Sequence, residues 1–474
     1  MSRQNAAVIL AAGLGKRMQS ALPKVLHPCA ELPLVCHVIR LAQACNCAPI
    51  VVVVSPATKE PVQEAVRQHV GDAAIRFAVQ AEPRGTGDAA RAGIGALDGF
   101  AGDVLLLYGD VPLLQAQTIE RLRQARQQAC VALLSAKVAQ PSGYGRVVRR
   151  ADGQVTAIVE EKDCNDAQRQ LQEINAGVYV CEAGVLRTAL AGLTPQNAQN
   201  EYYLTDIVAH AAGHGGAQAV VVHDVDEIRG VNNRLDLYEA TRALQDRLLR
   251  QHALAGVAVQ DVAGSFVGLD VVLEPDVTLG IGVQLYGKTV VRRGAVIEGP
   301  TVVRDSEIGP RCVVHAFCHL EQARMDEDAS IGPYARLRPQ AHLKSHARVG
   351  NFVELKKATL GEGAKANHLA YIGDAEVGAH SNIGAGTIFC NYDGFNKHRT
   401  QLGSRVFVGS NSTLVAPLQL RDGAFVAAGS TLTRDVPGDA LALGRAQQVI
   451  KEGYANKLRD RFAAQQQANK KKVL

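Results

Sequence analysis

A glycine loop with basic neighbours near the start of the chain has the composition of a phosphate-binding site. Gly13 and Gly15 follow the apolar run 6–10, and Arg17 and Lys24 come soon after them. Glycine lets backbone N–H groups approach a phosphate, and a helix that begins there favours anions. Lysine and arginine add side-chain charge for a polyphosphate. A lone G-x-G is also typical of a simple tight turn, so the interpretation needs support from elsewhere in the chain.

Two common phosphate motifs are excluded for this loop. The pattern G-x-x-x-x-G-K-[ST] does not occur in it. A dinucleotide fingerprint would have a third glycine where Met18 stands, and an acidic residue at the end of the second strand, where the chain reads Val54-Ser55-Pro56. The loop therefore indicates a different class of nucleotide site.

Three later segments favour a nucleoside triphosphate with Mg²⁺ as the ligand. A second polar loop, 80–87, carries glycines directly after an apolar run. Asp110 follows the apolar run 104–107, and Asn232 lies in the polar segment 230–234. Carboxylate and amide oxygens are hard ligands that suit Mg²⁺ on a triphosphate. Taken alone, Asp110 is more typical of a helix cap or a turn.

These residues can meet only if a sheet brings the ends of its strands to one edge. The first part of the chain alternates short apolar runs with helix-patterned segments at 34–44 and 118–127, which predicts a Rossmann-like, doubly wound α/β domain over residues 1–232. Ligands of such sheets bind at the carboxyl ends of the strands, where the glycine loop stands. The apolar runs are 6–10, 50–54, 77–79, 104–107, 131–134 and 219–222.

Apolar residues in the second part recur at steps of six, a period that neither an α-helix nor a single β-strand produces. A coil of short strands does produce it, because each apolar residue points inward and stacks on its copy one turn away. We therefore predict a parallel β-helix of hexapeptide repeats over residues 255–450, rather than an ordinary β-domain with chance spacing. The ladder consists of Leu273, Leu279, Leu285, Val291, Ile297, Val303, Ile308, Val314, Leu320, Ile331, Leu337, Leu343, Val349, Leu355, Tyr371, Val377, Ile383, Phe389, Leu402, Val408, Leu414, Leu420, Val426 and Leu432.

Departures from this repeat mark a second candidate site. A β-helix needs no reactive side chains for its stability, so such residues at irregular positions indicate a function. His368 and Tyr371 fall where the register shifts. Thirteen residues replace six between Phe389 and Leu402, which predicts an extruded binding loop. Histidine can take a proton near neutral pH. A lone histidine in a polar turn is more often structural, so these residues alone leave both roles of His368 open.

Composition narrows the remaining possibilities. A net charge of +5, the absence of Trp and an aromatic fraction of 4% argue against a nucleic-acid partner. Ten scattered cysteines without C-x-x-C spacing indicate free thiols, and neither a signal peptide nor a membrane-spanning run is found, so we predict a cytoplasmic protein without a membrane partner. Residues 233–254 have the pattern of an amphipathic linker helix, and 451–474 that of a polar, solvated tail.

The motifs of the first part resemble the nucleotidyltransferase domain of sugar-nucleotide pyrophosphorylases. They are Leu10-Ala-Ala-Gly-x-Gly-x-Arg-Met18, Leu22-Pro-Lys24-Val and Tyr108-Gly-Asp110-Val-Pro. With the β-helix behind them, nearly the whole chain, from residue 7 to residue 445, is similar to the family of bacterial bifunctional N-acetylglucosamine-1-phosphate uridyltransferase/glucosamine-1-phosphate acetyltransferases.

This resemblance implies an enzyme that makes UDP-N-acetylglucosamine for bacterial envelope polysaccharides. Glucosamine-1-phosphate would be acetylated with acetyl-CoA, and UMP would then pass from UTP to N-acetylglucosamine-1-phosphate with release of pyrophosphate. The resemblance also implies Mg²⁺, a left-handed coil, and a homotrimer with sites between neighbouring subunits. Two rivals stay open: a single-activity nucleotidyltransferase whose β-helix is an oligomerisation platform, and a scaffold protein with inactive sites.

For the uridyltransferase, the resemblance implies that Arg17 and Lys24 hold phosphates and that Asp110 and Asn232 ligate Mg²⁺. One departure is local: Pro83-Arg84 stand where family members often have Gln-Leu, which would change a side-chain contact but not the backbone contacts of Gly85. The nucleotide-binding residues would be Leu10, Ala11, Ala12, Gly13, Lys24, Gln80, Gly85, Thr86, Tyr108, Gly109 and Asp110, with Gln80, Gly85 and Thr86 at the uracil. The sugar-phosphate residues would be Gly145, Glu160, Asn175 and Asn232.

For the acetyltransferase, the resemblance implies that His368 is the base that takes a proton from the glucosamine amine. The sugar phosphate would be held by Arg338, Lys356, Tyr371 and Asn382, with help from Asn391. The acetyl-CoA site would be lined by Ala385, Asn391, Tyr392, Ser410, Ala428 and Arg445. An intact His368 and the extruded loop argue against a mere platform, and the retained glycine loop argues against a scaffold with inactive sites.

Overall fold

The computed structural model describes residues 4–13, 15–71 and 74–472, so Leu14 of the predicted glycine loop lies outside the described residues. The chain divides into two compact units. The first comprises Met1–Ala255 with Phe266–Val271, and the second comprises Gly256–Ser265 with Val272–Leu474. Each unit is described by itself below.

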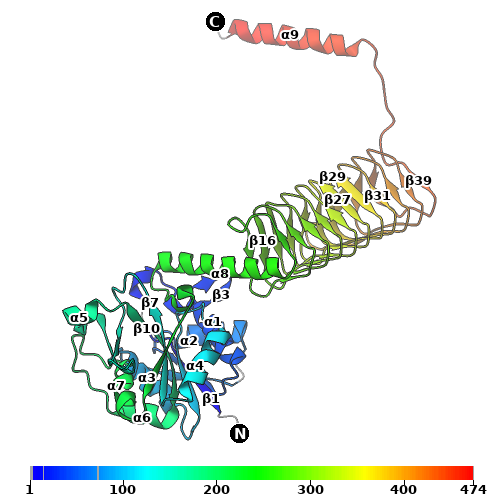
Figure 1. The fold of residues 1–474 in the computed structure, drawn as a ribbon. Helices are drawn as coiled ribbons and strands as arrows, with labels where there is room; N and C mark the ends of the chain where they lie inside the picture. Colours follow the sequence, from blue (N-terminus) through cyan, green and yellow to red (C-terminus); the bar gives the residue numbers. More distant parts are fainter. Residues whose placement is uncertain (1–3, 14, 72–73, 473–474) are drawn as a thin grey trace. The chain divides into compact units, whose positions relative to one another are not determined.

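The first unit is built on a mixed sheet in which β1 pairs in parallel with β4 and β6. The strand order is β11-β7-β10-β6-β1-β4-β5, and β10 runs antiparallel to both of its neighbours. Figure 1 shows strands of this sheet, among them β7 and β10, with helices packed around them. This confirms the Rossmann-like α/β class. The strands are β1 (Asn5–Leu10), β4 (Ile50–Val54), β5 (Ile75–Val79), β6 (Asp103–Tyr108), β7 (Val131–Lys137), β8 (Arg146–Arg149), β9 (Val155–Val159), β10 (Glu173–Glu182) and β11 (Ala217–Val221), besides the small hairpin β2 (Pro28–Cys29) and β3 (Leu32–Pro33).

Helices cover both faces of this sheet, which is why its central strands are apolar throughout. Ala7 and Ile9 of β1 face one core with α1, α2 and α4, while Ala6 and Val8 face the other core with α3, α6 and α7. The segment predicted as a helix at 34–44 is confirmed as α1. The helices are α1 (Leu34–Ala44), α2 (Lys59–His69), α3 (Thr86–Gly95), α4 (Ala116–Arg126), α5 (Asp166–Arg169), α6 (Ala183–Ala191) and α7 (Asp206–Gly213), with short 3₁₀ turns at η1 (Lys16–Met18), η2 (Lys24–Leu26), η3 (Glu161–Asp163) and η4 (Val225–Ile228).

The linker segment forms the helix α8 (Arg234–Leu254), as predicted, and belongs to the first unit. Asn233 caps its N-terminus, because the side-chain oxygen accepts from the backbone N–H groups of Leu235 and Asp236 at 2.8 and 3.0 Å. Further along, the amide of Gln245 exchanges two hydrogen bonds with the backbone of Val267 in β13 (Phe266–Val267). The start of the helix is therefore capped, and its middle is hydrogen-bonded to β13.

The second unit is a left-handed parallel β-helix, as expected. Each short strand pairs with a strand one coil later, as Leu279 does with Ile297 and Ile297 with Val314. One face carries β12 (Ala258–Val259), β15 (Thr278–Leu279), β18 (Val296–Ile297), β21 (Val313–Val314), β24 (Ser330–Ile331), β27 (Arg348–Asn351), β29 (Lys365–His368), β31 (Asn382–Ile383), β34 (Phe407–Val408), β37 (Phe425–Val426) and β39 (Leu441–Ala442). The remaining strands are β14 (Val272–Leu273), β16 (Val283–Tyr286), β17 (Val290–Val291), β19 (Thr301–Arg304), β20 (Glu307–Ile308), β22 (His319–Glu321), β23 (Arg324–Met325), β25 (Arg336–Leu337), β26 (His342–Leu343), β28 (Glu354–Leu360), β30 (Tyr371–Val377), β32 (Ile388–Cys390), β33 (Thr400–Leu402), β35 (Thr413–Val415), β36 (Leu418–Leu420) and β38 (Thr431–Leu432).

One member of the predicted ladder is wrong. Ile372, which pairs with Leu355, is the inward residue of its coil, and Tyr371 is only half-buried at the coil surface. The cause is a five-residue step at a corner of the coil, from Ile372 to the buried Val377, so a six-residue count back from Val377 falls on Tyr371. The other ladder residues are buried, and Met325 fills the gap that the six-residue count left after Leu320.

The extruded loop and the tail complete the second unit. Residues 392–397 are exposed, as predicted for the loop. The next strand of the β-helix after the loop is β33. The tail forms a helix, α9 (Tyr454–Lys472), which the polar composition did not lead us to expect. Its Ala, Gln, Leu, Arg and Lys residues are strong helix formers, which explains the helix. Among the residues that the structure describes, no helix is long and apolar enough to cross a membrane.

Candidate functional site

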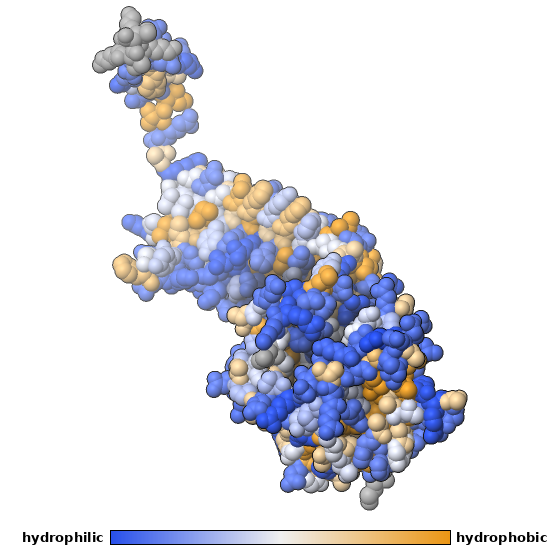
Figure 2. Space-filling view, turned by 90° about the vertical axis from the view of Figure 1, so that its left-hand side faces the viewer, coloured by the Kyte–Doolittle hydropathy of each residue, from blue (hydrophilic) through white to orange (hydrophobic). Residues whose placement is uncertain are grey.

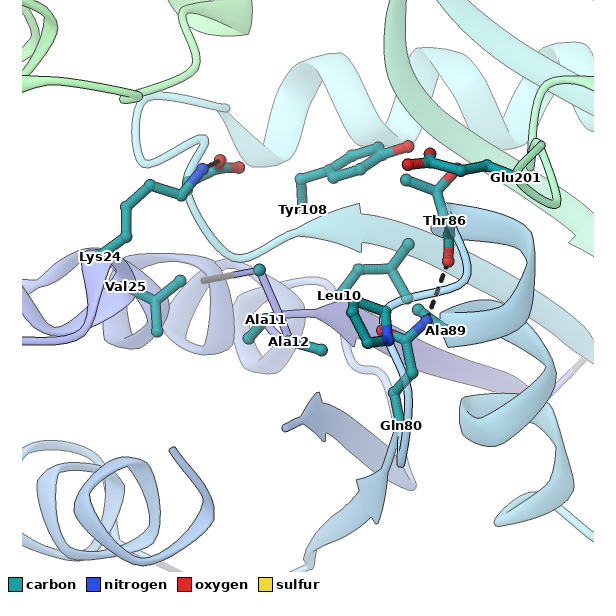
Figure 3. A pocket seen from close by; sticks show the side chains of 14 residues that line it. Leu10, Ala11, Ala12, Lys24, Val25, Gln80, Thr86, Ala89, Tyr108 and Glu201 are labelled. Carbon is teal, nitrogen blue, oxygen red and sulfur yellow. Dashed lines mark hydrogen bonds and ion pairs between the residues drawn. The ribbon is translucent and has the colours of Figure 1, made fainter. Parts of the chain in front are cut away.

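The first unit contains a cavity of about 310 Å³ at the carboxyl ends of β1 and β6 (Figure 3). All the predicted nucleotide-binding residues except Gly109 line it. Gly109 lies next to the lining residue Leu10, and its N–H donates to the carbonyl of Leu10 at 2.9 Å. The lining residues are Leu10, Ala11, Ala12, Gly13, Lys24, Val25, Gln80, Pro83, Gly85, Thr86, Ala89, Tyr108, Asp110 and Glu201.

The two glycines of the first loop differ in their surroundings. Gly15 has a φ of +59°, and a Cβ there would lie 2.5 Å from Cβ of Lys24, so the loop can pack on the lysine only with glycine at this position. A Cβ at Gly13 would meet nothing within 4 Å. The open space above Gly13 is therefore part of the cavity, while Gly15 holds the loop against η2.

Two oxygen donors and two cations meet beside this loop. Lys24 forms an ion pair with Asp110, and its ammonium lies 3.5 Å from the side-chain oxygen of Asn232. Arg17 donates to the same oxygen at 3.0 Å. The backbone N–H of Val231 donates to the carbonyl of Asp110 at 2.9 Å, which keeps the two predicted metal ligands together.

This donor set fits Mg²⁺ that arrives with a triphosphate. One carboxylate and one amide oxygen leave most coordination positions to water and to phosphate oxygens, which is how Mg²⁺ is usually held with nucleotides. In the described ranges, no group of three or more His, Cys, Asp or Glu side chains could form a cage for a metal by itself. The residues present therefore suit a shared site with the nucleotide.

The second loop presents one hydrogen-bond acceptor to the cavity. The amide nitrogen of Gln80 donates to the carbonyl of Gly85 and to the carboxylate of Asp88, both at 3.0 Å, which leaves the side-chain oxygen as its remaining polar atom. Gly85 has a φ of +110°, and a Cβ there would lie 2.6 Å from the carbonyl oxygen of Tyr202, so only glycine fits. Arg84, the departure noted above, is exposed and pairs with Glu82 rather than lining the cavity.

The predicted sugar residues Gly145, Glu160 and Asn175 come together next to this cavity. The N–H of Asn175 donates to the carbonyl of Gly145 at 2.8 Å. A Cβ at Gly145 would lie 3.4 Å from a carboxylate oxygen of Glu160, so glycine leaves this carboxylate accessible. Burial raises the pKa of Glu160, whose other oxygen accepts from the hydroxyl of Thr205 at 3.1 Å. Asn232, the fourth predicted sugar residue, lies instead with Asp110.

Two residues of this region were not anticipated. Glu201 lines the cavity, and Thr205 orients Glu160. Both lie in the polar stretch before or at the start of α7, 40 residues or more after Glu160 in the chain, where no local pattern singled them out. The nearest signal was the run of polar and aromatic residues at 200–203.

In the second unit, several predicted acetyltransferase residues form one outward row at a corner of the coil. His368 ends β29, two residues after Ala366, and Ala385 stands two residues after Ile383, the partner of Ala366. Ser410 and Ala428 hold the same place on the next two coils, by the pairing of Ile383 with Val408 and of Val408 with Val426. Arg445 reaches this row by donating to the carbonyl of Ala428 at 2.8 Å. The row presents small side chains beyond the histidine.

The predicted sugar-phosphate residues lie at more than one place on the coil. Lys356 pairs with Gly373 at the end of another face and lies 3.7 Å from the carboxylate of Asp374, to which Asn391 also donates. Arg338 occupies the same place one coil earlier and binds Glu354 at 3.0 Å. Tyr371 begins this face, whereas Asn382 begins the face that carries His368. Tyr392 is exposed at the start of the extruded loop.

Lys397 of the extruded loop was not predicted as a site residue. It lies close enough to Lys356 that the neighbouring ammonium lowers its pKa. Two ammonium groups held side by side are arranged for a multiply charged anion such as a phosphate. The loop could be predicted from the sequence, but the position of Lys397 beside Lys356 could not.

Comparisons with known proteins cover nearly the whole chain. A family model described as the MobA-like NTP transferase domain matches residues 7–176. The "Bifunctional protein GlmU" of Sorangium cellulosum is 45% identical over 461 residues, which are 96% of this chain and 97% of that protein. Proteins of the same description from Stutzerimonas stutzeri and Geobacter sulfurreducens are 47% and 43% identical, over 94% and 96% of this chain and 98% and 99% of their own length.

Proposed function

Since the chain belongs to the family of bifunctional GlmU proteins, we propose which of its residues carry out each of the family's two reactions. The enzyme makes UDP-N-acetylglucosamine, with an acetyltransferase and a uridyltransferase activity in one chain. We assign the uridyltransferase to the first unit, because it contains the glycine-loop cavity and the matched NTP transferase domain. We assign the acetyltransferase to the row that begins at His368 in the second unit.

In the uridyltransferase, UTP occupies the cavity with its phosphates over Gly13. An oxygen of N-acetylglucosamine-1-phosphate attacks the α-phosphorus in line, the bond to the β-phosphate oxygen breaks, and pyrophosphate leaves. The attacking oxygen is already an anion, so no general base is required. Arg17 and Lys24 neutralise the charge that moves onto the leaving pyrophosphate, and positioning supplies the rest of the rate.

Asp110 and Asn232 would hold Mg²⁺, which would supply positive charge to stabilise the phosphates when it is bound. In the structure Lys24 pairs with Asp110 and Arg17 donates to Asn232, so the two cations lie beside the two oxygen donors and within the same cluster.

The base is recognised by Gln80. Its side-chain oxygen accepts the N3–H of uracil, since both of its N–H groups are engaged by Gly85 and Asp88. Cytosine carries an acceptor at N3, and two acceptors facing each other are unfavourable. Glu160 and Asn175 bind the sugar, and the raised pKa of the half-buried Glu160 suits a group that meets neutral hydroxyl and amide groups.

In the acetyltransferase, His368 takes a proton from the amine of glucosamine-1-phosphate as the nitrogen attacks the thioester carbonyl. The C–N bond forms, the C–S bond breaks, and CoA leaves as a thiolate that takes up a proton. The acetyl-CoA arm lies along Ala385, Ser410 and Ala428, with Asn391 and Tyr392 at its acetyl end and Arg445 at its phosphates. The single observation that carries this assignment is the alignment of these small residues with His368.

We also propose a homotrimer with sites shared between subunits. Two features support it. The sugar-phosphate residues Lys356 and Asn382 lie on different faces of the β-helix and on successive coils, so a neighbouring chain is needed to bring such groups together. Beside the histidine row, the exposed rings of Phe317, Tyr334 and Phe352 stack at 4.8 and 5.5 Å, and apolar surface of this kind runs along the coil in Figure 2. Sedimentation equilibrium measures the mass directly, and a monomer would contradict the proposal.

Because UTP and acetyl-CoA are metabolites of the cytoplasm, we place the enzyme there. The decisive experiment is product formation from glucosamine-1-phosphate, acetyl-CoA, UTP and Mg²⁺, with wild type beside His368→Ala. We expect the variant to make UDP-N-acetylglucosamine only from sugar phosphate that is already acetylated. A variant that still releases CoA thiol from glucosamine-1-phosphate would remove His368 from the reaction.

A further inference from the structure

We infer that Asn351 is a positioning residue that sets the tautomer of His368. The inference rests on the proposed role of His368 as the base. A neutral imidazole has one N–H and one lone pair, and it can accept a proton from a substrate only at the nitrogen that carries the lone pair. A neighbouring group must therefore fix which of the two ring nitrogens carries the lone pair.

The contact that decides it lies between two adjacent coils. Nδ1 of His368 is 2.9 Å from the side-chain oxygen of Asn351. An amide oxygen can only accept, so Nδ1 carries the proton and donates it to Asn351. Nε2 is left with the lone pair. This is the tautomer that a base requires if the substrate amine approaches from the Nε2 side.

The backbone holds these two side chains in register. Asn351 is the last residue of β27 and His368 is the last residue of β29, and the two residues are paired. Directly before them the coils touch, since a Cβ at Gly350 would lie 1.9 Å from the carbonyl oxygen of Asn367. Directly after them Phe352 and Leu369 both have positive φ, at 57° and 48°. The backbone therefore turns in the same way after both residues, and the two side chains leave the β-helix in the same direction.

A neutral partner differs from the carboxylate found beside many catalytic histidines. A carboxylate would stabilise the imidazolium, and this would lower the fraction of free base near neutral pH. Asn351 fixes the tautomer without adding a negative charge. The charged and titratable groups on the neighbouring strands are Arg348 on β27, Glu354, Lys356 and Lys357 on β28, Lys365 on β29, and Tyr371, Asp374 and Glu376 on β30.

The test compares Asn351→Ala and Asn351→Asp with wild type, with CoA release measured from about pH 6 to 9. We expect Asn351→Ala to lower kcat about 10- to 100-fold with little change in the KM for acetyl-CoA. We expect Asn351→Asp to recover activity at high pH and to move the acidic limb of the kcat profile upward by about one unit. A residue that merely supports the turn would not move this limb.

Three controls separate the possible failures. Arg348→Ala alters the other end of β27 and keeps the wild-type profile, and uridylyl transfer is unchanged in every variant. The ¹⁵N shifts of the His368 ring show Nδ1 protonated in wild type and a mixture of tautomers in Asn351→Ala. Wild-type kcat in Asn351→Ala, or an unmoved acidic limb in Asn351→Asp, overturns the inference even where His368→Ala is inactive. If His368→Ala itself keeps acetyl transfer, the proposed base is wrong and the inference falls with it.

Discussion

Replacing Gly177 by alanine should damage the uridyltransferase and leave the acetyltransferase intact. Gly177 lies in the irregular part of β10, with a φ of +74°. A Cβ there would lie 2.7 and 3.0 Å from two carbons of the Tyr108 ring, which lines the nucleotide cavity. Alanine in this backbone region costs about 1–2 kcal/mol, and displacing a packed ring costs about 1–3 kcal/mol more.

The displaced ring carries the effect to the site. Tyr108 shares a hydrogen bond with Thr86, and burial raises its pKa, so it remains a neutral phenol. Because a displacement of about 1 Å at a positioning group costs on the order of 100-fold in rate, we expect kcat/KM for UTP to fall about 10- to 100-fold. The assay is pyrophosphate release from UTP and N-acetylglucosamine-1-phosphate, with CoA release from glucosamine-1-phosphate measured on the same sample.

Gly184→Ala is the matched control for this variant. Gly184 lies in α6 of the same unit, and a Cβ there would meet nothing within 4 Å, so this alanine should be neutral or slightly stabilising. Wild-type kcat/KM for UTP in Gly177→Ala would refute the packing argument. An equal loss of both activities would show a general folding defect instead.

Three further changes have defined outcomes. Burial lowers the pKa of His37 from 6.5 to about 4, so below pH 6.5 the unfolded chain binds a proton that the folded chain does not. In urea unfolding, the free energy of unfolding should be full above pH 6.5 and fall by about 3 kcal/mol toward pH 4. His37→Gln should remove most of this pH dependence. Leu337→Ala, at a fully buried ladder position, should destabilise the β-helix by about 2–5 kcal/mol in calorimetry and spare the melting of the first unit. Excess EDTA should stop pyrophosphate release while CoA release continues, and loss of both would contradict a metal site confined to Asp110 and Asn232.

The fold could be predicted wherever the sequence repeats a simple rule. The inward ladder of the β-helix follows from the six-residue period, and apolar runs such as 50–54 mark buried parallel strands. The prediction was wrong at Tyr371, because a five-residue corner is as compatible with the coil as a six-residue one and leaves no local mark. Strand β10 was missed since its Asn-Ala-Gly segment interrupts the apolar pattern, at the point where the strand bulges beside Tyr108.

The candidate sites divide in the same way. Residues in compact motifs, such as Gly13 and Asp110, could be singled out because strand ends share one edge of a sheet. Glu201 and Lys397 could not, because their positions depend on how a loop folds back over residues far away in the sequence. The partner of His368 was missed for another reason: Asn351 lies one full coil away, and only the strand register shows that the two meet.

The outward row from His368 to Ala428 also acts as a measure of length. Neighbouring strands of a sheet lie about 4.8 Å apart, so the three intervals from His368 through Ala385 and Ser410 to Ala428 span about 14 Å. Backbone hydrogen bonds set this span, and side-chain substitutions along the row leave it unchanged. Such a surface can adapt to a longer or shorter ligand only by gaining or losing a whole coil. The extruded loop obeys no such restriction, because it leaves the coil between Phe389 and Leu402 and can change its length without moving any strand.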